Sequence, residues 1–326
     1  MRHVQGGKGA SRHIWVLWQI AQMWWLAAFS VAEVPMIAGP AMGTTYRVTL
    51  AADRPGMTGM TRGEVHREVE AVLSRIDRAA STWRNDSDAS RFNRAAAGEW
   101  VTVSADLAAI VETARGIHEQ SAGGFDITVG PLVRLWGSEA NEPSAVAIAE
   151  ARGRVGMRLV ESRPPTPDAG AALRKSCAGV EIDLSGIAPG YAVDQIGERL
   201  LELGSLSHLV ELGGEVRAWG QPSDGRPWRV LMRGGHADGE RPQEIDLPDG
   251  VALATSTCRP GRSPIDPRTG RPVAASRPRS AATVRAKCCA AADAWAVAAI
   301  VLDLELEPDA DGTITVPERL RSAQGP

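Results

Sequence analysis

Hydrophobic residues recur every three or four positions in two segments of the N-terminal half, which predicts two amphipathic helices. The first helix starts at the capping box Thr61-x-x-Glu64, and the second starts after Ser104 and ends at Gly123-Gly124. Their core-facing residues are Val65, Val69, Val72, Leu73 and Ile76 in the first helix and Leu107, Ile110, Val111 and Ile117 in the second. The flanking pattern predicts a strand over Met42–Leu50, a loop over Phe125–Gly130, a shorter helix from Ser144 and a surface loop over Ser162–Pro167.

After residue 179 the pattern changes to short apolar runs separated by turn residues, which is typical of strands. These runs are Val180–Leu184, Leu209–Leu212, Glu215–Trp219, Trp228–Met232, Val251–Ala254 and Ala282–Arg285. A helix through Ile196 and Leu200 ends at Gly204, and an alanine-rich helix covers Cys289–Leu302 ahead of a polar tail. We therefore predict an α+β fold of antiparallel sheets and packed helices, in one domain over residues 33–326.

Composition and charge narrow the classes of function. The chain is 44% apolar and 23% charged, which is typical of a globular protein and not of a disordered one. Its formal charge of −3 and the absence of a basic run interleaved with aromatic residues predict no binding to nucleic acid. The four cysteines have neither the spacing of a metal site nor the density of a disulfide framework, so they leave the redox compartment open.

The N-terminal residues predict export. Three basic residues precede an apolar, Trp-rich run from Ile14 to Ala32, and Ser30-Val31-Ala32 offers a small-residue cleavage site. Gln19 and Gln22 interrupt this run, which weighs against the alternative of a membrane anchor. We favour a signal peptide over residues 1–32, and therefore a location in the periplasm or on the outer face of the inner membrane.

A glycine-containing turn between Val180 and Asp194 is the strongest local signal of a binding site. An apolar run ends at Asp183, and the chain then passes Gly186 and Gly190 into a helix that Pro189 opens. Helix N-termini bind phosphate, because their first N–H groups are unpaired and carry positive dipole charge. A plain strand-to-helix turn explains the same residues equally well.

Several motifs in a fixed order make the signal specific. They are Met42-Gly43-Thr44-Thr45-Tyr46, Ser81-Thr82-Trp83 with Ser90-Arg91-Phe92-Asn93, Phe125-Asp126-Ile127-Thr128-Val129-Gly130-Pro131-Leu132, Asp183–Asp194, Leu212-Gly213-Gly214-Glu215-Val216-Arg217, Ala254-Thr255-Ser256, Asp266-Pro267-Arg268-Thr269-Gly270 and Ala292-Asp293-Ala294. This series resembles the ApbE-like FAD:protein FMN transferases over roughly residues 40 to 303.

The resemblance implies a T-fold-like domain that transfers FMN from FAD to a threonine hydroxyl of an acceptor protein, with Mg²⁺ and with release of AMP. The acceptor is expected to belong to a membrane or exported redox complex. FAD contacts fall on Met42, Trp83, Gly124, Phe125, Asp126, Asp183, Pro189 and Pro264. Metal positions fall on Gly186, Asp293 and Val297, and catalytic positions on Asp293 and Ser263.

A purely structural interpretation is also open for Trp83, Asp293 and Asp266. Trp83 is alternatively a half-buried core aromatic. Asp293 lies on an apolar helix, where an unpaired carboxylate is costly, so we favour a functional role for it. Asp266 fits a turn-forming role as well as a functional one, because Asp-Pro-Arg-Thr-Gly is good turn chemistry.

The sequence departs from the family pattern at three positions. Ser263 stands where the family commonly has a histidine that acts as base or positions the acceptor hydroxyl, and no other histidine lies in that loop. Pro189 replaces a lysine, and Val297 replaces a threonine that binds the metal. The sequence thus predicts a flavin transferase with a divergent site. The alternatives are a flavin-binding protein without transfer activity and an exported structural protein that keeps only the scaffold.

Overall fold

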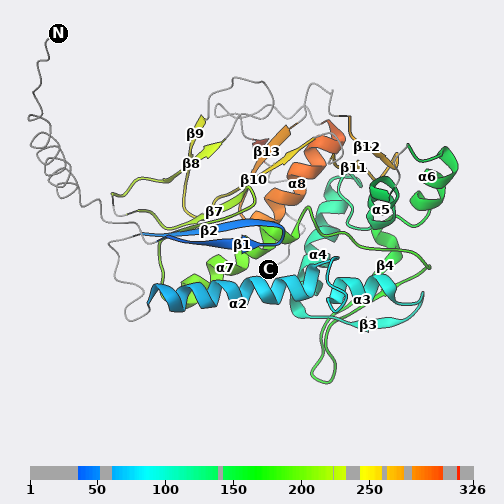
Figure 1. The fold of residues 1–326 in the computed structure, drawn as a ribbon, viewed down its shortest axis with the longest axis horizontal. Coiled ribbons are helices and arrows are strands. Elements are labelled where there is room, and N and C mark those ends of the chain that lie inside the picture. The colour runs from blue at the N-terminus through cyan, green and yellow to red at the C-terminus, as the bar shows by residue number, and fades with distance from the viewer. Residues whose placement is uncertain are drawn as a thin grey trace, which may run out of the picture. The chain divides into compact units, whose positions relative to one another are not determined.

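The fold is built on a sheet whose strands lie in the order β1-β2-β6-β7-β10-β13-β14 (Figure 1). The computed structural model describes residues 36–51, 61–138, 142–222, 224–232, 243–258, 263–274, 281–303 and 314–315. The strands are β1 (Met36–Ala41), β2 (Thr44–Leu50), β6 (His208–Leu212), β7 (Glu215–Trp219), β10 (Ala252–Thr257), β13 (Ala281–Ala286) and β14 (Ile314–Thr315). Neighbours are antiparallel except β13 and β14, which are parallel.

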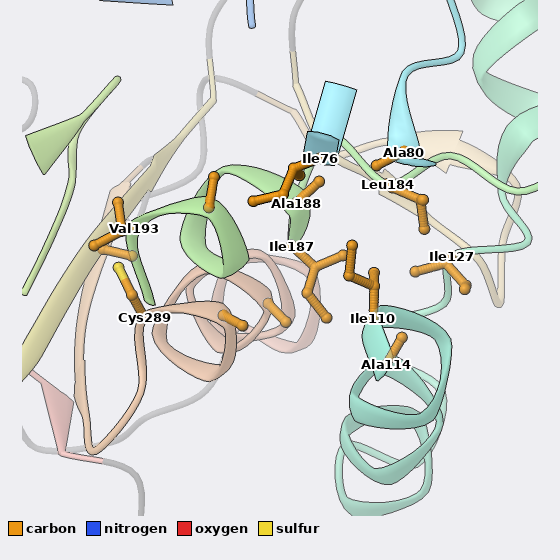
Figure 2. Packing of buried hydrophobic residues seen from close by; sticks show 14 of the residues in the cluster. Ile76, Ala80, Ile110, Ala114, Ile127, Leu184, Ile187, Ala188, Val193 and Cys289 are labelled. Carbon is orange, nitrogen blue, oxygen red and sulfur yellow. The ribbon is translucent and has the colours of Figure 1, made fainter. Parts of the chain in front are cut away.

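Four helices build the main core against one face of this sheet. Helix α7 (Ala188–Glu202) packs on β6 and β7, and α8 (Cys289–Leu302) packs on β10 and β13. Helix α2 (Arg62–Ala80) contacts α7, and α4 (Ala105–Gln120) contacts α8. Figure 2 shows apolar side chains of these elements meeting around Ile187. The core therefore surrounds the segment that leads into α7.

A two-stranded ribbon supplies a second apolar cluster. Strands β8 (Trp228–Met232) and β9 (Gln243–Leu247) pair with each other, and their apolar residues share a cluster with Val216 and Ala218 of β7. Trp219 of the same strand belongs to the main core, and the Arg217 side chain bonds Asp194 of α7. Strand β7 thus has an apolar face toward the ribbon and a mixed face toward the helices, as the twofold alternation of a strand requires.

The remaining elements form smaller units beside the main sheet. A second sheet has the order β3 (Trp100–Thr102), β5 (Ala172–Lys175) and β4 (Val160–Arg163), and β11 (Ile265–Asp266) pairs with β12 (Arg271–Pro272). The short helices are α3 (Asp88–Arg94), α5 (Gly130–Ser138), α6 (Ala145–Arg152) and the 3₁₀ turn η1 (Met157–Leu159). Within the described ranges, no helix is long and apolar enough to cross a membrane.

The predicted fold class and the helix starts are confirmed. The Thr61 N–H donates to the Glu64 carboxylate at 2.7 Å while the Glu64 N–H donates to the Thr61 hydroxyl, which is the reciprocal capping box. Ser104 and Ser144 each accept a backbone N–H at the start of α4 and α6. These short-range signals hold because a cap is decided within four residues.

One predicted strand is wrong, and the strand predicted over Met42–Leu50 and two predicted loops are confirmed except at their end residues. Val180–Leu184 is not a strand, and its ladder contact is one isolated bridge between Glu181 and Val129. Met42 lies in the turn between β1 and β2, with φ of 49°, and not in a strand. The loop predicted over Ser162–Pro167 begins as the end of β4, and the loop over Phe125–Gly130 runs into α5. The predicted N-terminal signal peptide and anchor alternatives lie outside the described residues.

A buried histidine gives the fold a predictable dependence on pH. His208 is fully buried, its ring stacks on Trp219 with centroids 4.9 Å apart, and its Nδ1 lies 3.1 Å from the Ser205 hydroxyl. Burial lowers the pKa of His208 to about 4. An unfolded histidine has a pKa of about 6.5. The unfolded state therefore binds more protons between these values, and folding stability falls as the pH drops through this window.

We expect His208 to account for a loss of about 2 kcal/mol of unfolding free energy between pH 7 and pH 5. The His208→Gln variant removes the titrating group and should lose that much less stability over the same interval. Urea unfolding of both proteins at the two pH values measures the difference. Equal pH dependence in the two proteins would show that the folded histidine titrates normally.

Candidate active site

The first turns of α7 and α8 are held together by two carboxylates. Asp293 of α8 accepts a hydrogen bond from the Gly190 N–H at the start of α7, at 3.2 Å. A Cβ atom at Gly190 would lie 2.4 Å from the Cys289 carbonyl oxygen, so only glycine permits this approach. Pro189 occupies the first turn of α7, where its missing N–H costs no helical bond, as predicted.

The second carboxylate belongs to α7 and caps the start of α8. Asp194 of α7 accepts hydrogen bonds from the Cys289 and Ala290 N–H groups, at 2.9 and 3.0 Å. Cys288, at the N-cap of α8, provides no side-chain cap, so Asp194 fills that role. Arg217 of β7 neutralises Asp194 with an ion pair of 2.7 Å.

Asp293, by contrast, has no basic partner among the described residues. Burial raises its pKa well above the usual range for an aspartate, and the carboxylate of Glu215 raises it further. Burial also raises the pKa of Glu215, to about 7. Two carboxylates that interact in a buried environment without a described cation favour the binding of one. Sequence analysis assigned no role to Glu215, although its place directly after Gly213-Gly214 was a usable signal.

The glycine turn packs against α8 at Val297, one helical turn after Asp293. In the described part of the chain, no donor bonds the Gly186 carbonyl, because the Gly190 N–H that would close the helical turn is bonded to Asp293. A Cβ atom at Gly186 would lie 3.0 Å from a Val297 methyl and 3.5 Å from the Phe125 ring. The structure therefore brings Gly186, Val297 and Phe125 together, as the resemblance implies, beside the turn of α8 that carries Asp293.

This donor set fits magnesium better than a softer metal. Carboxylate and carbonyl oxygens are the protein ligands that Mg²⁺ takes, and it retains several waters or phosphate oxygens in addition. Within the described residues no cluster of three or more His, Cys, Asp or Glu side chains could hold a metal by itself. A metal at Asp293 and Gly186 thus needs oxygen atoms from a ligand such as a diphosphate. The Val297 side chain offers none.

Asp183 and the Phe125 segment are joined through their backbones. The Asp183 N–H donates to the Ile127 carbonyl at 2.7 Å, and the Asp183 carboxylate accepts the Ser185 N–H at 2.9 Å. The Asp183 side chain is partly exposed at the start of the glycine turn. The two predicted FAD-contacting segments are therefore held side by side.

Asp126 contacts Thr128 and His118 through its carboxylate. Its carboxylate accepts hydrogen bonds from the Thr128 N–H and hydroxyl, and its other oxygen lies 3.3 Å from His118 Nδ1. Both Asp126 and His118 line a pocket of about 300 Å³ together with Gly123, Arg152, Val155, Gly156, Met157, Arg158, Pro267 and Arg268. Gly124 packs against the last turn of α8, where a Cβ atom would lie 2.6 Å from Leu302.

Trp83 is 95% exposed, which excludes the alternative that it is a core aromatic. An indole that far out of the core is available to stack on a flat ligand. Met42 is partly buried against the main core in its turn. Among the described residues no hydrogen bond or ion pair joins Trp83 or Met42 to Asp293, so their role in a common site stays a prediction.

The loop at Ser263 is organised by Asp266. The Asp266 carboxylate accepts the Arg268 N–H and guanidinium at 2.9 Å, and its carbonyl accepts the Gly270 N–H. Burial, which would raise the pKa of Asp266, is outweighed by Arg268, and the pKa lies below its usual value. These bonds support the turn-forming interpretation of Asp266. Ser263 and Pro264 are partly buried just ahead of it, with the Pro264 carbonyl bonded by the Val273 N–H.

Comparison with known proteins identifies close relatives of the chain. The ApbE family model matches residues 42–309. The FAD:protein FMN transferase of Haemophilus influenzae is 33% identical over 257 residues, which are 74% of this chain and 73% of that protein. The solved flavin transferase ApbE of Vibrio cholerae superposes with a TM-score of 0.73 at 31% identity, over 82% of this chain and 86% of its own. The apo flavinyl transferase ApbE of Pseudomonas stutzeri superposes with a TM-score of 0.72 at 33% identity, over 82% and 84%.

The reciprocal caps predict a large stability effect at Asp194. Asp194→Ala leaves two helix N–H groups without an acceptor and Arg217 buried without a counter-ion, so we expect a loss of about 3–5 kcal/mol in unfolding free energy. Replacing both partners, with Asp194→Leu and Arg217→Met, should cost less than Asp194→Ala alone, because no unpaired charge remains. Denaturant unfolding measures both. A double variant less stable than the single one would mean that the ion pair is not what sets the cost.

Proposed function

The chain belongs to the ApbE family, and on that premise we propose that it is a FAD:protein FMN transferase whose acceptor is a threonine hydroxyl. The observation that carries the proposal is the buried Asp293 carboxylate without a described basic partner, on the helix that packs against the Gly186 turn. Oxygen ligands of this kind suit Mg²⁺ on a diphosphate. FAD has such a diphosphate between its FMN and AMP halves.

The reaction is a phosphoryl transfer. The acceptor oxygen forms a bond to the phosphorus of the FMN half, the bond from that phosphorus to the bridging oxygen breaks, AMP leaves and the hydroxyl proton is released. Such transfers depend mainly on positioning and on neutralising the charge of the phosphate oxygens. Bound Mg²⁺ would supply that neutralisation, with Asp293 and the Gly186 carbonyl as its protein ligands.

The flavin half would be bound by the remaining predicted contacts. The exposed Trp83 supplies an aromatic face on which an isoalloxazine ring stacks. Met42 and the Phe125-Asp126 segment would add contacts along the molecule, with Asp183 fixed beside them by the bond to Ile127. The Trp83 and Asp183 segments would then bind the flavin, while Asp293 and Gly186 would bind the metal.

Two of the three departures from the family pattern, Ser263 and Val297, bear on the chemistry of this site. Without a histidine at Ser263 the acceptor hydroxyl lacks the family's base, and a lost general base costs about 10²–10⁴ in rate. Val297 removes one oxygen ligand, and a retained water can take its place on Mg²⁺. Slow transfer is consistent with both changes. These same substitutions favour the second candidate, a flavin-binding protein without transfer activity.

The N-terminal residues place the reaction outside the cytoplasm in this proposal. A signal peptide over residues 1–32 would export the chain, and the acceptor would be an exported or membrane redox protein that carries a threonine. Support for this comes from the basic residues, apolar run and small-residue cleavage site of that segment. Comparison of the mature N-terminus with the gene-encoded one, by mass spectrometry, tests it.

The decisive experiment combines the purified protein with FAD, Mg²⁺ and a threonine-bearing acceptor. We expect covalent flavin fluorescence on the acceptor and an equal amount of AMP. Asp293→Asn keeps the side-chain size but removes the charge, and it should weaken magnesium binding by more than the roughly 10–100-fold that loss of an outer-shell contact costs. FAD binding without AMP would leave the non-catalytic binder as the function, and no FAD binding would reject both candidates.

Val297→Thr tests the metal position directly. Threonine has nearly the shape of valine and brings a hydroxyl to the place where a methyl now faces Gly186. We expect about tenfold tighter Mg²⁺ binding in the presence of FAD, measured by calorimetry, which is the scale of one supporting contact at a metal. Val297→Ala is the matched control, since it removes the methyls without adding oxygen. Equal affinities of the two variants would place the metal elsewhere.

A further inference from the structure

The Ser90-Arg91-Phe92-Asn93 motif has no role in the site described so far. It forms most of α3, a short helix that starts after the Ser87 N-cap, and the Phe92 side chain is fully buried. Ser90 and Asn93 lie three residues apart and therefore share one face of the helix. Both are polar residues on the inner side of a helix, and each makes a specific bond to a different predicted flavin segment.

Ser90 faces the loop that carries Trp83. The Ser81 carbonyl accepts hydrogen bonds from the hydroxyls of Ser87 and Ser90, the latter at 3.3 Å. The Ser81 hydroxyl in turn accepts the Trp83 N–H at 3.3 Å. Because the Trp83 indole is almost entirely exposed, core packing does not fix it. The bonds from the Ser87 and Ser90 hydroxyls to the Ser81 carbonyl therefore help to define where this loop lies.

Asn93 faces the segment that ends in Asp183. Its amide Nδ2 donates to the Ile182 carbonyl at 2.9 Å, and its Oδ1 accepts the Ile182 N–H at 2.8 Å. One side chain thus satisfies both backbone groups of a buried residue, as a neighbouring strand would. This explains why the apolar run at Val180–Leu184 stays extended without belonging to a sheet.

Lys175 of β5 adds two further hydrogen bonds to this arrangement. Its side chain is buried, and its ammonium donates to the Asn93 carbonyl at 2.8 Å and to the Val180 carbonyl at 3.0 Å. Burial lowers the pKa of Lys175. Together the four hydrogen bonds of Asn93 and Lys175 hold α3 and residues 180–182 as one unit.

The opposite side of the same segment is held by the Phe125 loop. The Asp183 N–H bonds the Ile127 carbonyl, and Glu181 bridges Val129. Residues 180–183 therefore lie between α3 and the segment that starts at Phe125. Movement of α3 would shift the predicted flavin contacts on both sides.

We propose that Ser90 and Asn93 are positioning residues that set the Trp83 loop and the Asp183 segment at a fixed separation for the flavin ligand. The identity of the ligand rests on the proposed function. The geometry rests only on the hydrogen bonds made by α3. Sites of this kind need their contact groups held within about 0.5 Å, and a short helix bonded at both ends provides that rigidity.

Asn93→Leu tests the Asp183 end, with Asn85→Leu as the matched control on the exposed loop before α3. We expect amide hydrogen exchange at Ile182 and Asp183 to accelerate at least about tenfold in Asn93→Leu, because the bonds that close this segment are lost. Exchange at the same amides should be unchanged in Asn85→Leu. This measurement needs no ligand, so it tests how Asn93 holds residues 180–183 even if the protein does not bind FAD. Unchanged exchange at Ile182 in Asn93→Leu would overturn the proposal.

FAD affinity, measured in single and double variants, separates positioning from general destabilisation. Asn93→Leu should weaken FAD binding about tenfold in the wild-type background and much less in an Asp183→Ala background, since coupled residues are non-additive. Its effect on unfolding free energy should be the same in both backgrounds. Equal losses of FAD affinity in the two backgrounds would reduce Asn93 to a structural residue.

Ser90→Ala is the milder variant in case Asn93→Leu does not fold. It removes one hydroxyl from the Ser81 carbonyl, so its effect on FAD affinity should disappear in a Trp83→Ala background and persist in Asp183→Ala. An effect of the same size in all three backgrounds would contradict the positioning role. Absence of FAD binding in the wild type would reject the proposed function. The exchange rates at Ile182 would then be the only test of whether Asn93 holds this segment.

Discussion

The mutual capping of α7 and α8 is the constraint on which the rest of the site depends. Asp194 of α7 takes the first N–H groups of α8, and Asp293 of α8 takes the Gly190 N–H of α7. Each helix therefore needs the other in order to begin where it does. Because the Gly190 N–H bonds Asp293, it does not bond the Gly186 carbonyl four residues earlier.

The two capping carboxylates differ in whether a basic side chain neutralises them. This difference distinguishes a carboxylate with a structural role from one proposed to bind a ligand. Asp194 has Arg217 at 2.7 Å, so its charge is compensated within the fold. Burial raises the pKa of Asp293, the charge of Glu215 raises it further, and burial raises the pKa of Glu215 as well. A fold gains nothing from placing two acids together unless a cation joins them under working conditions. The chain thus has a neutralised cap at Asp194 and an unneutralised one at Asp293, and the proposed function assigns the second to the metal.

The sequence predicted the parts of this arrangement that are local. The caps at Thr61, Ser104 and Ser144 and the Pro189 helix start follow from residues within one turn of one another. The run at Val180–Leu184 was mistaken for a strand because its backbone partners are an asparagine side chain 89 positions earlier and the Ile127 carbonyl. The exposure of Trp83 and the interaction of Glu215 with Asp293 likewise depend on the tertiary structure, and they leave no periodic pattern in the sequence. The resemblance supplied the order of the motifs, and the structure supplied the bonds that connect them.

The positions that depart from the family pattern are those expected to touch reactants, while the residues that hold the framework are bonded throughout. Val297 and Ser263 would have met the metal and the acceptor. Asn93 and Asp194, in contrast, bond backbone groups of another element, and the Gly190 N–H bonds the Asp293 carboxylate. Framework bonds of this kind are made whether or not chemistry takes place, since they serve the folded state. Under the proposed function, flavin binding is therefore the more robust property of this chain. Transfer depends on the two positions where side-chain oxygen or imidazole has been exchanged for valine and serine.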